Sequence, residues 1–189
     1  MQPFETPRFA CMINGEIYNY RDLCNHYPCD LRSNSDCEIV VHLFEKIVGT
    51  EKSTIKHMKT LIGMLDGEFA IIIYEFATND VFYGVDQVRA RPLFIGHANS
   101  KQEIWLASEL KGMASAREVH EVRAGECGHI VKPWIGFEMT RGTHFSYDAL
   151  REVPQLENAK FTFPQSAERV HDLFMENLRL KSNPERQAG

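Results

Sequence analysis

Several features that define common protein classes are absent from this sequence. Its longest apolar run, Phe69 to Tyr74, is far too short to cross a bilayer. Lys and Arg total 21 against 26 Asp and Glu, and no basic cluster is present, so neither a nucleic-acid partner nor a membrane partner is indicated. The first ten residues carry Glu5 and Arg8 and do not resemble a secretion signal. We therefore expect a cytoplasmic protein.

Cysteine is present without a regular pattern. An odd number of thiols, five in 189 residues, favours a reduced set over a disulfide framework. Cys24 and Cys29 are separated by four residues, a spacing that zinc ligands use. No second close pair of Cys or His follows to complete four ligands, so we expect no metal site.

The remaining composition is that of a globular domain, with 43% hydrophobic and 25% charged residues. Ser35 and Glu38 have capping-box spacing ahead of apolar residues that recur at helical intervals up to Gly49. A second helix is predicted over Thr54 to Leu65. The pattern then changes to strand-like runs: Gly67–Phe76, Val81–Val85, Leu93–His97, Ile104–Ala107 and a hairpin formed by Cys127–Val131 and Phe137–Thr140.

Two further helices are predicted, a short one capped by Ser108 and a closing one that begins at Ser166. Helices followed by a meander of strands and a closing helix indicate an α+β fold.

One string near the start carries chemical information. Ala10 to Ile13 is predicted as a short strand that Asn14-Gly15 interrupts, and this dipeptide alone is typical of a tight turn. The alternative is an oxyanion hole, in which the Asn14 side-chain amide and the Gly15 N–H point at one developing negative oxygen. Glycine suits that role because it has no Cβ to hinder a ligand near the backbone.

The longer string favours the second interpretation. Asn14-Gly15-Glu16-Ile17-Tyr18-Asn19 closely resembles the glutaminase motif of glutamine-hydrolysing asparagine synthetases, which are class II glutamine amidotransferases. Further likenesses follow in the order and at about the intervals of that family, and together they cover Phe9 to about Lys132. They are Ser35-Asp36-Cys37-Glu38, Leu65-Asp66-Gly67-Glu68-Phe69-Ala70, Asp86 with Arg91-Pro92-Leu93-Phe94, and Ala107-Ser108-Glu109-Leu110-Lys111.

This resemblance assigns roles to four residues. It implies that Asn14 and Gly15 form the oxyanion hole, and that Glu16 and Asp36 hold the α-ammonium group of glutamine through charge-assisted hydrogen bonds. Both carboxylates also fit a purely structural role. Asp36 lies in a first helical turn, where the helix dipole favours a negative charge in any case. Glu16 could simply be a solvated residue beside a turn.

The resemblance also implies a catalytic residue that this chain does not show. Family members are N-terminal nucleophile (Ntn) hydrolases whose first residue is Cys, with its own amine as general base. Here the chain opens Met1-Gln2-Pro3, which resembles a point inside a full-length member. Cys11 has no free amine, and Cys37, although near a helix N-terminus, where thiol pKa values fall, occupies a position that the family fills with unreactive residues. We therefore predict no nucleophile and no glutaminase activity from this chain alone.

The implied fold is the four-layer αββα sandwich of Ntn hydrolases without its N-terminal strands. Residues 1–165 would form a partial amidotransferase domain, and residues 166–189 a helix and tail leading toward an ATP-pyrophosphatase synthetase domain. The chain contains no Gly-Gly pair for the phosphate loop of that domain, so no cofactor is expected here, ATP and Mg belonging to the synthetase domain. Two departures from the family are Val85, which replaces an Arg, and Arg89, which replaces a Gly.

The implied function is the glutaminase part of an asparagine synthetase, which supplies ammonia for ATP-dependent asparagine formation from aspartate. Glutamine is the expected ligand, and the expected partner is the missing N-terminal segment or a synthetase subunit. The alternatives are a non-catalytic module that binds glutamine or complements a partner, and a decayed remnant.

Overall fold

The structure is a computed structural model that describes residues 1–98, 103–131, 138–143 and 168–175. Met1–Phe145 form one compact unit and Ser146–Gly189 a second. In the second unit residues 168–175 are helical, as predicted for the helix from Ser166. The expected domain boundary at residue 165 lies outside the described residues and stays a prediction.

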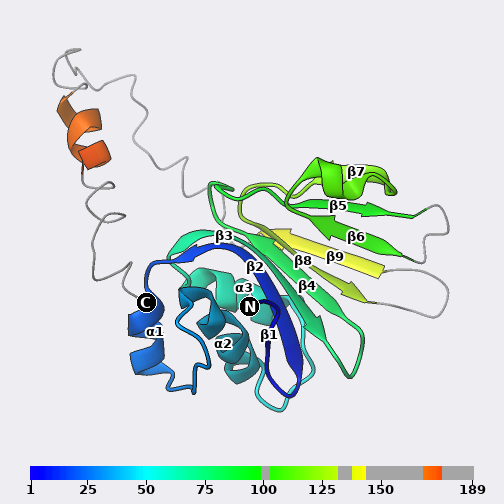
Figure 1. The fold of residues 1–189 in the computed structure, drawn as a ribbon, viewed down its shortest axis with the longest axis horizontal. Helices are drawn as coiled ribbons and strands as arrows, with labels where there is room; N and C mark the ends of the chain where they lie inside the picture. Colours follow the sequence, from blue (N-terminus) through cyan, green and yellow to red (C-terminus); the bar gives the residue numbers. More distant parts are fainter. Residues whose placement is uncertain (99–102, 132–137, 144–167, 176–189) are drawn as a thin grey trace. The chain divides into compact units, whose positions relative to one another are not determined.

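The first unit is built on a six-stranded antiparallel sheet with the strand order β1-β2-β3-β4-β8-β9 (Figure 1). The predicted hairpin is confirmed, because β8 and β9 pair from Glu126↔Thr143 to Val131↔Glu138. The strands are β1 (Phe4–Glu5), β2 (Phe9–Ile17), β3 (Gly67–Glu75), β4 (Val81–Val85), β8 (Glu126–Val131) and β9 (Glu138–Thr143).

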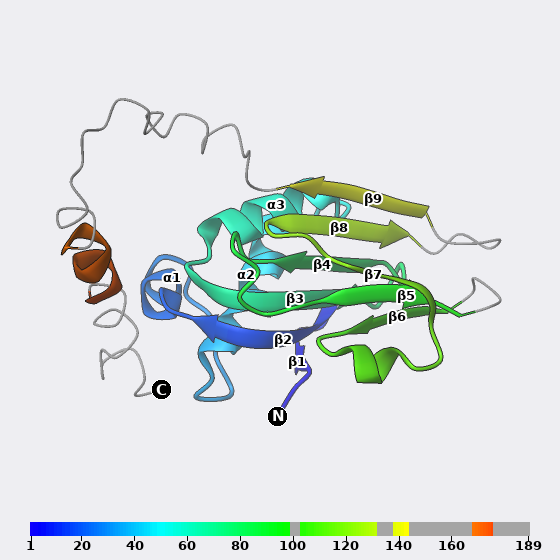
Figure 2. The same ribbon diagram turned by 90° about the horizontal axis from the view of Figure 1, so that it is seen from above.

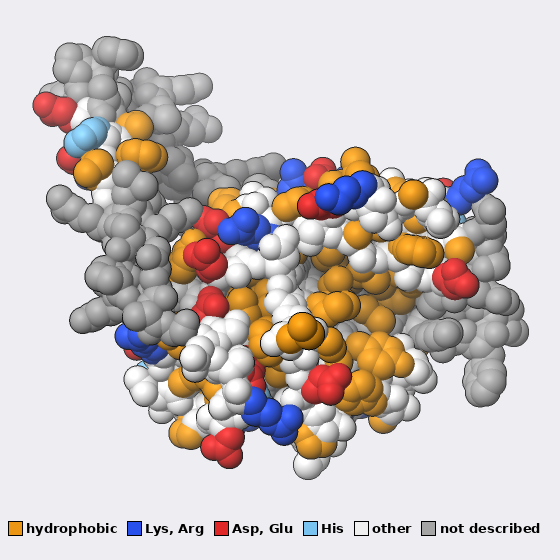
Figure 3. All heavy atoms as spheres, viewed as in Figure 1, with side chains coloured by type: hydrophobic (Ala, Val, Ile, Leu, Met, Phe, Trp, Pro, Cys, Tyr) orange, Lys and Arg blue, Asp and Glu red, His pale blue; other side chains and the backbone are white. Residues whose placement is uncertain are grey.

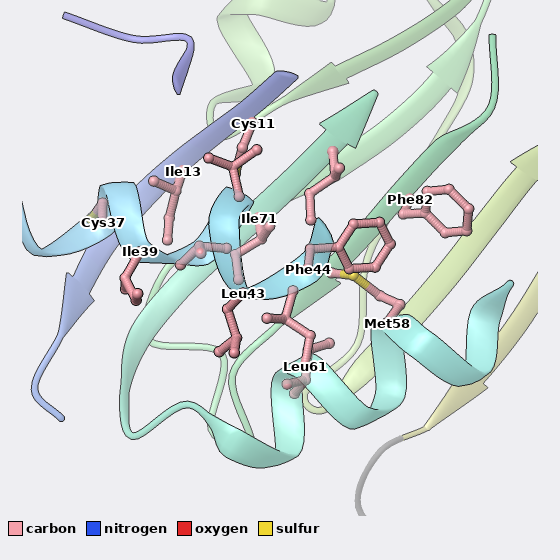
Figure 4. Packing of buried hydrophobic residues seen from close by; sticks show 14 of the residues in the cluster. Cys11, Ile13, Cys37, Ile39, Leu43, Phe44, Met58, Leu61, Ile71 and Phe82 are labelled. Carbon is pink, nitrogen blue, oxygen red and sulfur yellow. The ribbon is translucent and has the colours of Figure 1, made fainter. Parts of the chain in front are cut away.

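Helices cover one face of this sheet (Figures 1 and 2). They are α1 (Tyr20–His26), the 3₁₀ turn η1 (Asp36–Glu38), α2 (Ile39–Val48) and α3 (Ile55–Met64). Apolar residues at helical spacing on α2 and α3 meet alternate residues of the strands, which point to the same face. Figure 4 shows this core, in which Leu43 and Phe44 of α2 and Leu61 of α3 lie over Ile71 of β3.

A smaller sheet packs on the opposite face (Figures 1 and 2). It has the order β6-β5-β7, from β5 (Phe94–His97), β6 (Ile104–Ala107) and β7 (Arg117–Glu121). A second core joins the two sheets through Ala70, Tyr83, Leu93 and Ile95. The short helix η2 (Leu110–Met113) is present, although its N-cap position is Glu109 and not the predicted Ser108. The α+β class is confirmed, and the described residues form three successive layers, α, β and β.

Asn14-Gly15 does not interrupt its strand, so that prediction was wrong. β2 continues through both residues, with Asn14 opposite Ala70 and Gly15 opposite Phe69. The tight-turn interpretation fails for the same reason. Pairing along the whole of β3 overrides the local turn preference of the dipeptide.

The predicted capping box at Ser35 is half right. The Ser35 hydroxyl accepts a hydrogen bond from the Cys37 N–H at 3.3 Å, as an N-cap should. Glu38 does not reach back to Ser35, because its carboxylate accepts from the N–H groups of Arg32 and Ser33 instead. A complete capping box occurs at α3, between Thr54 and His57.

Arg89 occupies a backbone conformation that favours glycine. Its φ is +55°, in a loop that the Asp86 carboxylate organises by accepting from the N–H groups of Val88 and Ala90. The sequence departure at this position is therefore accommodated by strain, and the side chain is held by an ion pair with Glu121.

We expect Arg89→Gly to be more stable than Arg89→Ala by about 1 kcal/mol, because a left-handed conformation costs a residue with a Cβ about that much. Both variants lose the ion pair with Glu121, so their difference isolates the backbone term. Urea unfolding of the two variants measures it. Equal midpoints would show that this loop relaxes around the arginine.

Candidate active site

The candidate site lies along the edge of β2 that faces away from β3. The Ile13 N–H and C=O both bond the carboxamide of Gln2, at 2.8 Å and 2.7 Å, and the Ile17 N–H bonds the Asp36 carboxylate at 2.6 Å. Alternate residues of a strand direct their hydrogen-bonding groups to the same edge. The Gly15 N–H therefore points to this edge too.

Within the described part of the chain, the Gly15 N–H is the donor of this edge that has no acceptor. No described residue accepts a hydrogen bond from this N–H. The Gly15 carbonyl, in contrast, accepts from the Cys37 thiol at 3.4 Å. Asn14 lies next to it with an exposed side chain on the face of the sheet opposite the helices. That these two donors form an oxyanion hole stays a prediction of the motif.

The backbones of β2 and β3 approach each other closely beside this donor. A Cβ on Gly15 would lie 2.0 Å from the Glu68 carbonyl oxygen, and one on Gly67 would lie 2.2 Å from that of Glu16. Gly15 also has a φ of +155°, which residues with a side chain rarely adopt. Both glycines are therefore needed for the shape of the strand pair at the site.

The segment Ser35–Glu38 is attached to the same edge. Asp36 is fixed by the Ile17 N–H and Cys37 by the Gly15 carbonyl, while Glu38 binds the preceding loop. The Ser35–Glu38 segment, which the sequence predicted as the start of a helix, therefore also connects α2 to the edge of β2. Sequence spacing gave no sign of this second role.

The structure brings Glu16 and Asp36 into one neighbourhood. Burial is the main cause of the raised pKa of the Cys37 thiol. Both carboxylates also lie close enough to Cys37 to raise this pKa further. Glu16 is exposed and stands directly opposite Glu68, a like-charge pair that is unfavourable across a sheet. Negative charge thus concentrates beside the open N–H, as a site for an ammonium group requires.

Asn19, the last residue of the motif, has a structural role that the sequence analysis did not assign. Its side-chain amide donates to the Met64 carbonyl at 2.9 Å and accepts from the Asp66 N–H at 3.0 Å. It joins the end of β2 to the link between α3 and β3. Its place in a motif of otherwise functional residues was the available signal.

The three buried cysteines are not activated nucleophiles. Burial raises the pKa of Cys37 to about 12 and of Cys127 to about 11, and raises that of Cys11 further. Although Cys37 lies near a helix N-terminus, where thiol pKa values usually fall, desolvation by burial outweighs that effect. Burial and Cys24 raise the pKa of partly buried Cys29 to about 11. In the described part of the chain, no group of three or more His, Cys, Asp or Glu side chains could hold a metal ion.

Glu38 makes the stability of this segment dependent on pH. Burial alone raises the pKa of its carboxyl, but hydrogen bonds from Ser33 and Arg32, with a contribution from His42, outweigh burial and lower it overall. A lowered folded-state pKa gives stability that is present above the unfolded value, about 4.3, and is lost as pH falls through the folded value.

We therefore expect the free energy of unfolding to be higher for the wild type than for Glu38→Gln at pH 7, with the gap narrowing below about pH 4. Denaturant unfolding at a series of pH values measures the gap. A gap that stays constant from pH 7 to pH 3 would contradict the assignment.

The model of one family, described as a glutamine amidotransferase domain, matches residues 1–115. The chain belongs to this glutamine amidotransferase family. The resemblance that the motifs predicted is confirmed. A probable asparagine synthetase (glutamine-hydrolysing) of Acanthamoeba polyphaga mimivirus is 28% identical over 200 residues, covering 100% of the chain and 35% of the relative. The asparagine synthetase of Rattus norvegicus is 35% identical over 120 residues, covering 62% of the chain and 20% of the relative.

The fold of this amidotransferase domain also has a match among solved structures. Glutamine phosphoribosylpyrophosphate amidotransferase from B. subtilis, complexed with ADP and GMP, superposes with a TM-score of 0.60 at 23% identity, over 75% of the chain and 31% of that structure. This likeness shows the Ntn-hydrolase type of α+β sandwich. The chain spans between 20% and 35% of the two asparagine synthetases. No described helix is both long and apolar enough to cross a membrane.

Proposed function

We propose that this chain forms the part of the active site that binds glutamine, in the glutaminase domain of an asparagine synthetase. The whole protein would hydrolyse glutamine to glutamate and pass the ammonia to an ATP-dependent reaction that makes asparagine from aspartate. The observation that carries the proposal is the open Gly15 N–H beside Asn14, on an edge whose neighbouring groups are already bonded.

Two kinds of contact would hold the substrate. The Gly15 N–H and the Asn14 amide would donate to the side-chain carbonyl oxygen of glutamine, and more strongly as that oxygen gains negative charge during hydrolysis. Asp36, held by the Ile17 N–H, and Glu16 would accept from the α-ammonium group. Two carboxylates around a cation select an amino acid over a simple amide.

The attacking sulfur would come from outside residues 1–189. Cys11, Cys37 and Cys127 are buried thiols with raised pKa values, and the pKa of partly buried Cys29 is raised as well. The proposed partner is therefore a segment or subunit that begins with a nucleophilic cysteine. The same whole protein would hold the ATP and Mg.

Titration calorimetry tests the binding proposal directly. We expect the chain to bind glutamine, and Asp36→Asn to weaken binding about tenfold or more, because a hydrogen bond to a charged group contributes about 1.5–3 kcal/mol. Asparagine can still accept the Ile17 N–H, so this change removes charge and keeps shape. Asn14→Ala should also weaken binding, and Asn25→Ala, at an exposed asparagine on α1, is its matched control. No heat with glutamine on folded protein would remove the proposal.

A second function, complementing a partner without catalysis, is favoured by one observation. Met12 of β2 is 51% exposed on the face of the six-stranded sheet opposite the helices, which is the face that carries Asn14, and Phe76, just beyond β3, is 44% exposed. In the view of Figure 3, hydrophobic side chains gather between β2 and the three-stranded sheet. An apolar segment of a partner would cover this area.

We expect the isolated chain to self-associate through this area, and Met12→Lys to reduce the association. Sedimentation equilibrium over a range of concentrations measures it. A wild-type monomer at all concentrations, with a cooperative thermal transition, would exclude the partner-complementing function.

A further inference from the structure

The edge of β2 is closed by side chains in place of a neighbouring strand. β1 ends at Glu5 and pairs with only Ala10 and Cys11. Beyond it, Gln2 takes the place of a strand at Ile13, and the Ser35–Glu38 segment supplies partners at the next two outward-facing residues. The partner at Gly15 is a cysteine thiol.

Cys37 lies beside both halves of the proposed site, the Gly15 peptide and the Asp36 carboxylate. Its thiol donates to the Gly15 carbonyl oxygen at 3.4 Å, and the residue before it, Asp36, accepts from the Ile17 N–H at 2.6 Å. Figure 4 shows it at the start of the helical segment, on the side of Ile13. Its side chain is 4% exposed, so water does not compete for the hydrogen bond.

We infer that Cys37 is a positioning residue, whose thiol fixes the Gly15–Glu16 peptide and so aims the adjacent Gly15 N–H and the Glu16 carboxylate at the substrate. The expected effect on glutamine binding rests on the proposed function, but the contact between the Cys37 thiol and the Gly15 carbonyl exists in the free protein. The thiol acts only as a hydrogen-bond donor, and no bond to sulfur forms or breaks.

The chemistry of the thiol agrees with a donor role. Because burial raises the pKa of Cys37 to about 12, the sulfur keeps its proton at neutral pH and can donate to the carbonyl. A thiolate there would face the Gly15 carbonyl oxygen and two carboxylates, and would repel all three. Gly15 has a φ of +155°, which residues with a Cβ rarely adopt. Because glycine has access to more backbone conformations than other residues, a hydrogen bond to its carbonyl is needed to hold this peptide in one orientation.

Three variants of the full chain separate this role from simple packing. Cys37→Ala removes the donor, and Cys37→Ser retains one on a similar side chain. Cys127→Ala removes a buried sulfur of β8, far along the sheet from β2, and controls for lost volume. In each, the carbonyl ¹³C shift of Gly15 is measured by NMR without ligand, and glutamine affinity is measured by calorimetry.

We expect the Gly15 carbonyl shift to change in Cys37→Ala and to stay near wild type in Cys37→Ser and Cys127→Ala. Glutamine affinity is expected to fall about fivefold in Cys37→Ala, the equivalent of one neutral hydrogen bond, and less than twofold in the other two. An unchanged carbonyl shift in Cys37→Ala would overturn the inference, as would equal affinity losses for alanine and serine. If the wild type binds no glutamine, the proposed function fails, while the carbonyl shift still decides the role of Cys37.

Discussion

Gly15→Ala is expected to lower the free energy of unfolding by about 3 kcal/mol or more, since overpacking and a strained φ each cost about 1–3 kcal/mol. The added Cβ would lie 2.0 Å from the Glu68 carbonyl oxygen and 2.7 Å from the Phe69 Cα. Both atoms belong to the backbone of β3, so no side-chain rotation can relieve the overlap. The strands would have to separate where the site is built.

Gly49→Ala is the matched control for this prediction. Gly49 also has a positive φ, +56°, but its nearest potential contact is the Lys46 carbonyl oxygen at 4.0 Å. It should lose only the backbone term, about 1–3 kcal/mol, because its φ of +56° and ψ of −128° are rare for residues with a Cβ. Guanidinium unfolding monitored by circular dichroism gives both values. Equal losses in the two variants would show that crowding between β2 and β3 is not what requires glycine at position 15.

Arg8→Ala is expected to cost about 3–5 kcal/mol, because it leaves a buried carboxylate without its partner. The Arg8 guanidinium bonds Glu75 at 2.8 Å, and the Glu75 side chain is only 3% exposed. The same guanidinium donates to the Gly49 and Glu51 carbonyls at 2.9 Å and 2.8 Å. One side chain thus ties the α2–α3 connection to the sheet.

The double variant Arg8→Ala/Glu75→Gln separates the cost of the unpaired Glu75 charge from the cost of the lost hydrogen bonds to the Gly49 and Glu51 carbonyls. Neutralising Glu75 should recover part of the loss, because the unpaired charge is then gone. Arg21→Ala, at an exposed arginine on α1, should change stability by less than about 0.5 kcal/mol. Thermal and denaturant unfolding measure all three. A double variant no more stable than Arg8→Ala would show that the carboxylate is not the source of the cost.

Sequence patterns were sufficient for the class of fold and for most of its elements, but they did not predict β1, α1 or β7. The helical spacing around Leu43 and Leu61 placed α2 and α3, and the apolar runs placed β3 to β6 within a residue or two. These elements follow from local periodicity and from which side chains must be buried. The motifs also brought together Asn14, Gly15, Glu16 and Asp36 before any geometry was known.

The errors came from interactions between residues distant in sequence. Asn14-Gly15 was expected to break its strand, and only pairing with residues more than 50 positions away keeps it extended. Glu38 was assigned to Ser35 by spacing, yet the N–H groups of Arg32 and Ser33 offered two bonds instead of one. The closure of the β2 edge by Gln2, Asp36 and Cys37 has no sequence signature, because it depends on how the helix packs.

The most direct test of the account is the amide ¹H–¹⁵N resonance of Gly15 during a glutamine titration. If this N–H is the open donor of a glutamine site, its proton resonance should shift downfield and saturate with the affinity found by calorimetry, while Ile13 and Ile17, whose N–H groups are already bonded, shift much less. A Gly15 resonance that does not move at saturating glutamine would contradict the account.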